Sequence, residues 1–122
     1  MANVSISANL FPYRLSMKAH AKLAGELTIE IVNNDSKTKL LTMDLTFPEQ
    51  VSTDKSGMNR SISKQIKDVQ PGAKLKMNFP VFLTQRASTG VFSGKLLISE
   101  QAPNLEYATA NYSKEVSFRI ID

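Results

Sequence analysis

Cysteine and tryptophan are absent from this sequence of 122 residues, and histidine occurs once, as His20. Without cysteine the chain can form no disulfide, no thiolate nucleophile and no cysteine-ligated zinc or iron–sulfur site. A serine–histidine–acid triad would have to use His20, which we expect on the solvent side of an early strand. The sequence therefore predicts no metal site and no cofactor.

Long apolar runs are also lacking. A secretory signal has a basic start followed by an apolar run, whereas the first residues here alternate between apolar and polar side chains. No stretch approaches the roughly 18 consecutive apolar residues of a membrane-spanning helix. We expect a cytoplasmic protein if the chain is taken as it stands, and an extracellular module if it is a fragment of a longer surface protein.

The composition is that of a folded globular chain. Hydrophobic residues make up 42% of the sequence, charged residues make up 21%, and the formal net charge is +4. Such a chain has enough apolar side chains to build a core. Its length falls within the usual size of one unit, so we expect residues 1–122 to form a single domain.

Apolar and polar residues alternate with a period of two along much of the chain, which predicts strands with one buried face. One such run covers residues 13–23, as one strand or as two short strands in line, and another covers residues 27–31. With residues 24–26 as the loop, these runs form a hairpin in which Ala21 faces Ile29 and His20 faces Glu30. Gly25 would supply the positive φ that such a loop commonly needs.

Turn residues mark the ends of further strands. The short polar side chains of residues 33–35 bond local backbone and end the second run, and Pro71-Gly72 fits a type II turn. Pro80 places its strand at a sheet edge or at a kink. Further strands are expected at residues 41–47, 62–66, 75–81, 92–98 and 116–120, with a long connection over residues 101–113. About seven to nine strands at this spacing indicate an all-β fold, an immunoglobulin- or fibronectin-III-like antiparallel β-sandwich.

Three segments carry a family resemblance: AHAKLAGELTIEIVNND, LLTMDLTFPEQV and DVQPGAKLKMNFPVFL. Gly25 with Asn33, the Phe47-Pro48 pair and the Pro71-Gly72 turn match a pattern in which these residues flank alternating strands. In these features the chain resembles the CARDB and DUF11-like modules of bacterial and archaeal surface proteins. It departs from them after Asn33, where Asp35 and Ser36 replace a usual glycine. The resemblance implies a sandwich used for spacing, adhesion or protein contact, without catalytic residues.

Motifs for catalysis are missing. The segment GVFSG, residues 90–94, has its serine in the fourth position and does not match the G-x-S-x-G elbow. No phosphate-binding glycine loop, zinc motif or calcium loop is present. We therefore expect a protein that is not an enzyme. A hydrolase built from two carboxylates that meet only in the fold stays open, because such acids have no local signature.

Positive charge is concentrated in one part of the chain. Residues 55–95 contain eight basic residues and one acid, so this segment carries +7 and the remainder carries −3. Lys74 and Lys76 project from one face of a strand, and we expect Lys64 and Lys67 to extend them into a basic strip. Lysines that guard a sheet edge against aggregation would give the same pattern.

The partner expected for this strip is another protein, met through a sheet face or an edge strand, and an edge-strand dimer is a further possibility. The alternative is a polyanion, either nucleic acid or an anionic surface. Phe11, Pro12 and Tyr13, with Tyr107 and Tyr112, offer aromatic contact surface, although packing in the core or in loops is the favoured interpretation.

Overall fold

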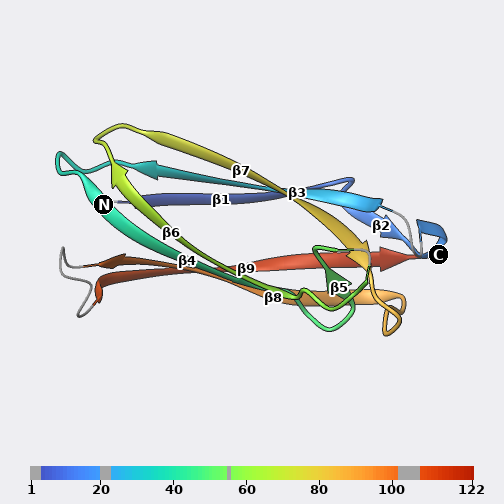
Figure 1. The fold of residues 1–122 in the computed structure, drawn as a ribbon. Coiled ribbons are helices and arrows are strands. Elements are labelled where there is room, and N and C mark those ends of the chain that lie inside the picture. The colour runs from blue at the N-terminus through green and yellow to red at the C-terminus, as the bar shows by residue number, and fades with distance from the viewer. Residues whose placement is uncertain (1–3, 20–22, 55, 102–107) are drawn as a thin grey trace.

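In the computed structural model, residues 4–19, 23–54, 56–101 and 108–122 are described, and they form two β-sheets that share one core (Figure 1). The first sheet has the order β1 (Val4–Phe11), β3 (Leu23–Asn33), β7 (Lys74–Leu83) and β5 (Val51–Ser52). The second has the order β2 (Arg14–Ser16), β9 (Ala108–Ile121), β8 (Gly90–Gln101), β4 (Lys39–Thr46) and β6 (Ser61–Val69). One 3-10 turn, η1 (Met17–Ala19), follows β2. The expected all-β sandwich is confirmed.

Period-two alternation places the apolar side chains between the two sheets. Burying one leucine or isoleucine side chain contributes about 1.5–3 kcal/mol, so a slip of one residue in any strand would be strongly unfavourable. The inward positions of β3, β4, β8 and β9 are the most completely buried. They include Leu27, Ile29, Ile31, Leu41, Met43, Leu45, Leu96, Ile98 and Phe118.

The hairpin expected around Gly25 is wrong. Residues on both sides of this glycine belong to one continuous strand, β3, which lies between β1 and β7. The antiparallel partner that precedes it is β1, whose Ala8 faces Ile29. Residues 20–22, which include His20 and Ala21, lie outside the described residues.

Gly25 is needed for a close approach and not for a turn. A Cβ at this position would lie 2.9 Å from the carbonyl oxygen of Phe11 and 3.0 Å from Cδ2 of Leu15. These two residues flank the point where the chain crosses from β1 in one sheet to β2 in the other. The glycine within β3 therefore makes room for this crossing, and the register of β3 with β7 shifts beside it, between Leu23 and Gly25.

Two expected boundaries also differ. The run over residues 13–23 is not one strand, because β2 ends at Ser16 and η1 follows; the hydroxyl of Ser16 accepts a hydrogen bond from the backbone N–H of Lys18 at 3.2 Å. Such local bonds compete with a strand ladder. The connection predicted over residues 101–113 is too long, since β9 begins at Ala108 and pairs with β8 from there.

The turns predicted at residues 33–35 and at Pro71-Gly72 are confirmed. Asn33 ends β3, and its side-chain oxygen accepts the backbone N–H of Asp35 at 3.0 Å. Gly72 has a φ of 76°, and the N–H of Ala73 donates to the carbonyl of Gln70 at 2.9 Å. Pro80 lies in β7 before the two residues that pair with β5, so its part of the strand is at the sheet edge, as expected.

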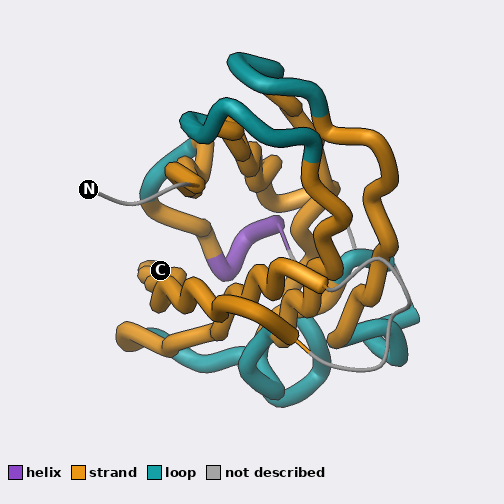
Figure 2. The backbone as a smooth tube through the Cα atoms, turned by 90° about the vertical axis from the view of Figure 1, so that its left-hand side faces the viewer, coloured by secondary structure: helices purple, strands orange, loops and turns teal. Residues whose placement is uncertain are grey.

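Loops gather at two ends of the sandwich. At one end, which Figure 2 turns toward the viewer, β3 leads into β4, β6 leads into β7, and β1 begins. At the other end β1 crosses to β2, β7 leads into β8, and β9 ends (Figure 1). None of the helical segments in the described part of the chain has the length and apolar character needed to cross a membrane.

Candidate interaction surfaces

Lys74 and Lys76 lie side by side on the outer face of β7. In the register with β3, Lys74 lies opposite Val32 and Lys76 lies opposite Glu30. The ammonium of Lys74 is 3.6 Å from a carboxylate oxygen of Glu30. Both lysines are exposed, so this ion pair adds little stability. Both lysines are therefore accessible to a binding partner.

Lys64 lies in the other sheet. Its strand, β6, is the edge strand of the five-stranded sheet and lies beside β4. The Lys64 ammonium is 5.6 Å from the ring centroid of Phe79, a buried residue on the inner face of β7. Such a contact is a cation–π interaction. Lys64 therefore points across the open edge between the two sheets and not onto the face that carries Lys74.

Lys67 is exposed near the end of β6, beside a break in its pairing. The register of β4 with β6 shifts there, and Asp68 has a φ of 55°. The four lysines predicted to form one strip are thus divided between two sheets. Sequence proximity misled the prediction, because the turn after β6 carries the chain from one sheet to the other.

The remaining basic residues of this segment are scattered as well. Arg86 pairs with Glu49 at 3.0 Å in an exposed ion pair, and Lys95 lies opposite Glu115 in the register of β8 with β9. Lys55 lies outside the described residues. The concentration of charge in the sequence therefore does not become one basic surface among the described residues.

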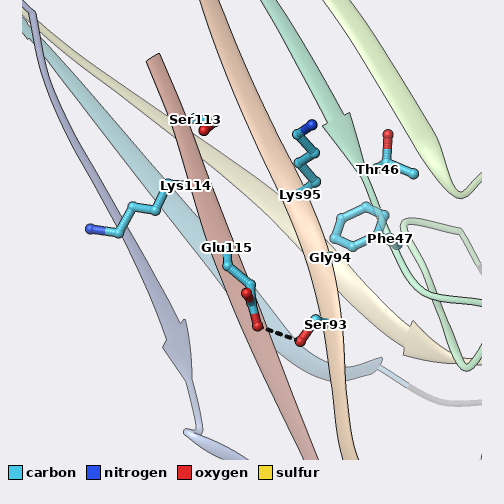
Figure 3. A pocket seen from close by; sticks show the side chains of 8 residues that line it. All are labelled: Thr46, Phe47, Ser93, Gly94, Lys95, Ser113, Lys114 and Glu115. Atoms are coloured by element: carbon cyan, nitrogen blue, oxygen red, sulfur yellow. Dashed lines mark hydrogen bonds between the residues drawn. The ribbon is translucent and has the colours of Figure 1, made fainter.

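A shallow hollow of about 430 Å³ lies over β4, β8 and β9 (Figure 3). Ser93 donates a hydrogen bond to Glu115 within it at 2.6 Å, and Lys95 points away from it. The Lys114 ammonium points toward β1, where it donates to the carbonyl of Ile6 at 3.5 Å. A second hollow of about 450 Å³ includes Glu49 and Arg86. Each of these two hollows is lined by one carboxylate, whereas hydrolysis by paired acids needs two.

A buried ionic cluster closes the end of the sandwich where β3 leads into β4. Lys39 donates to Asp35 at 2.9 Å and also to Glu100, and the hydroxyl of Tyr112 donates to the second oxygen of Glu100. The side chains of Lys39 and Glu100 are each only 9% exposed. Buried charges are tolerated when they are paired in this way, so we assign the cluster a structural role.

The pKa shifts in this cluster follow from those contacts. Burial, followed by the hydrogen bond to Glu100, raises the pKa of Tyr112 to about 12. Burial alone would lower the pKa of Lys39, but its hydrogen bonds to Glu100 and Asp35 outweigh burial and raise it. The hydrogen bond from Lys39 lowers the pKa of the Asp35 carboxyl. These shifts favour the protonated forms of Lys39 and Tyr112 and the ionised form of Asp35.

This cluster could not be predicted from the sequence, because no local pattern connects its residues. Lys39 and Glu100 are 61 residues apart in the chain. Their contact exists because β4 and β8 pair with Leu41 opposite Glu100. No group of three or more acidic, histidine or cysteine side chains suited to a metal ion occurs within the described ranges.

The aromatic residues are divided between the two ends. Tyr112 belongs to the buried cluster, and Tyr107 lies outside the described residues. Phe11 and Tyr13 are 81% and 63% exposed, so for these two the favoured interpretation, packing in the core or in loops, is wrong. Both residues lie where the chain crosses from β1 to β2, so neither sheet covers their rings.

No protein-family model and no curated protein matches this sequence. Solved structures are similar in fold. One is a FixG-related protein from Vibrio parahaemolyticus, with a TM-score of 0.54 and 12% identity over 98% of each chain. Another is AvmM, which catalyses macrocyclization in alchivemycin A biosynthesis, with a TM-score of 0.61 and 10% identity over 98% of this chain and 89% of the other. At these identities the likeness concerns the fold alone.

Proposed function

We propose that this chain is an immunoglobulin-like β-sandwich module that acts without catalysis, by binding another protein. The strand order supports the fold type. The series β1-β3-β7 faces β9-β8-β4-β6, which corresponds to strands A, B and E facing G, F and C, with one further strand at the C edge. This arrangement is common to modules of the immunoglobulin and fibronectin III type.

The observation that carries the proposal is the mixed charge on the outer face of the four-stranded sheet. Lys74 and Lys76 on β7 lie beside Glu30 on β3. Glu26 is also exposed on β3, opposite Phe11 on β1 and Pro80 on β7. A polyanion would be repelled by these carboxylates, whereas a protein surface can present both signs of charge. This face therefore suits a protein partner better than nucleic acid.

The proposed relationship to CARDB and DUF11-like modules rests on turn residues. Asn33 at the end of β3 and the Pro71-Gly72 turn before β7 support it. Gly25 does not add support, because it lies within β3. A spacing or adhesion role would follow from this relationship.

Polyanion binding is the runner-up function, and exposed Lys67, Lys74 and Lys76 favour it. A polyanion complex would lose affinity steeply as salt rises, because counterions are released on binding. A protein complex held by a mixed-charge face would depend less on salt. The salt dependence of affinity therefore separates the two functions.

The proposed function is tested by recovering partners of the tagged chain from a lysate of its source cells, with and without nuclease. The variant Lys74→Glu/Lys76→Glu is compared with Lys18→Glu/Lys37→Glu, which changes the net charge equally at exposed sites elsewhere. We expect a discrete protein that survives nuclease and is lost only with the first variant. Recovery of nuclease-sensitive material alone, or equal recovery with both variants, would overturn the proposal.

A further inference from the structure

Two arginines are brought together where β2 pairs with β9. Arg14 and Arg119 are direct partners in this parallel pair, and Arg119 lies opposite Val91 in the antiparallel pair with β8. The three side chains therefore form one row across the outer face of the five-stranded sheet. We call Arg14, Arg119 and Val91, together with the adjacent Tyr13, the arginine row.

The guanidinium groups in this row lack a compensating acid among the described residues. No carboxylate there lies within ion-pair distance of Arg14 or Arg119, while other basic residues such as Lys39, Lys74 and Arg86 do have such partners. Like charges directly opposite each other on neighbouring strands are destabilising. The fold therefore holds two cations together without neutralising them.

Tyr13 provides a second indication that the row is open to a ligand. Its ring is 63% exposed and lies 5.3 Å from the Arg14 guanidinium carbon. The Arg14 hydrogen bond and charge, with the charge of Arg119, lower the pKa of the Tyr13 hydroxyl. An arginine stacked on a ring keeps its fork of N–H donors oriented, so less entropy is lost when it binds a carboxylate.

Apolar side chains lie beside the two charges. Val91 is 57% exposed, and Ile121, two residues after Arg119 on β9, is 38% exposed. Arginine and tyrosine are enriched at the centres of protein interfaces. The arginine row offers a partner both an anchor for carboxylates and a contact for an apolar side chain.

We propose that the arginine row binds an acidic segment of a partner protein, in which carboxylates meet Arg14 and Arg119 and an apolar side chain meets Val91. This inference rests on the proposed function and adds a second contact surface to it. The segment fits better than nucleic acid because the rows beyond the arginine row carry no net positive charge. The next row on β8 and β9 presents Ser93 and Ser117, and the one after it pairs Lys95 with Glu115, so a phosphate backbone would meet a carboxylate beside that cation.

The test is a titration of the isotope-labelled full chain, followed by the amide resonances of β2, β8 and β9. The probe is a short peptide in which glutamate and leucine alternate, and the matched probe has glutamine in place of glutamate. An oligothymidine of equal charge is the third probe. Variants are Arg14→Gln/Arg119→Gln and, as a matched control at exposed positions outside both proposed surfaces, Lys37→Gln/Arg60→Gln.

We expect the acidic peptide to shift resonances near residues 13–16, 91 and 117–121, and the glutamine peptide to leave them unchanged. Losing both charge-assisted contacts should weaken binding by about tenfold or more, and the Lys37→Gln/Arg60→Gln control should bind as the parent chain does. Equal shifts with both peptides, tighter binding of oligothymidine at the row, or full binding by the arginine variant would overturn the inference. Partner capture that depends on Lys74 and Lys76 but not on the arginines would overturn it while leaving the proposed function intact.

Discussion

The two ends of the sandwich differ in how their charged side chains are paired. Where β3 leads into β4, Lys39, Asp35, Glu100 and Tyr112 bond to one another, and the two most buried of them, Lys39 and Glu100, form an ion pair. Where β1 crosses to β2, Arg14 and Arg119 lie exposed and without a carboxylate partner among the described residues. Satisfied charges at one end stabilise the fold, and unsatisfied charges at the other leave binding free energy available for a partner.

Buried hydrogen bonds reinforce this difference. The side-chain amide of Asn33, which has no exposed surface, donates to the carbonyls of Lys37 and Val69 at 2.9 Å each. It therefore ties the turn after β3 to the end of β6. The end that carries Phe11 and Tyr13 instead exposes aromatic rings. One end is built for stability, and the other has the features of a contact surface.

Removing Lys39 should have the largest effect on stability. In Lys39→Met, Glu100 loses its cation while it stays buried, and breaking a buried pair by removing one partner costs about 3 kcal/mol or more. Denaturant unfolding measures the loss. Lys37→Met, at an exposed position two residues away, should lie close to the parent chain. Equal stabilities for the two variants would contradict the role assigned to the cluster.

Asn33→Ala should have the next largest effect. The change leaves the buried carbonyl of Val69 without its donor, which costs about 1–3 kcal/mol. Asn34→Ala is the control, because Asn34 is exposed and its amide donates to the exposed hydroxyl of Ser5. A thermal unfolding midpoint that drops by the same amount in both variants would show that Asn33 is not a special contact.

The pH dependence of stability should reflect the ionic cluster at the end where β3 leads into β4. The lowered pKa of Asp35 gives a contribution that is present above its ordinary pKa and is lost as pH falls through its folded value, below about 4. The raised pKa values of Tyr112 and Lys39 give contributions that are present below about pH 10 and are lost as pH rises further. Unfolding free energies across this range check both limbs.

Tyr112→Phe removes the group whose pKa is raised most clearly. We expect a shallower decline in stability between pH 10 and 12 than in the parent chain, with the acidic limb unchanged. An alkaline limb identical to that of the parent chain would exclude Tyr112 as its source.

The smallest effect on stability is expected at the opposite end. Arg14→Gln/Arg119→Gln removes a like-charge pair and no ion pair of the described residues, so the free energy of unfolding should stay the same or rise slightly. A clear loss of stability in this variant would mean that the arginines are structural, and it would remove the contrast between the ends.

Local patterns predicted most of the strands and the turns after β3 and before β7, because those depend on neighbouring residues, but they did not predict β1. Alternation around Leu41 and Leu96 identified buried faces, and Pro71-Gly72 identified its turn. The partner of β3 could not be predicted in the same way. The run before Leu23 and the run before Phe11 both alternate, and either satisfies the apolar face of β3, so only the crossing near Gly25 decides between them.

Surfaces were harder to predict than strands for the same reason. Lys64 and Lys74 are close in the chain, but β6 and β7 belong to different sheets. Arg14 and Arg119 are far apart in the chain, yet parallel pairing makes them direct neighbours. Sheet membership, which depends on long-range contacts, decides which charges share a surface.

We propose that this chain binds a protein through the outer face of the four-stranded sheet. Amide hydrogen exchange of the chain, alone and with the captured partner, tests it most directly. We predict slower exchange along β7 around Lys74 and Lys76, where the free edge of the strand would be covered. Protection confined to the turn between β3 and β4, with β7 unchanged, would contradict the claim.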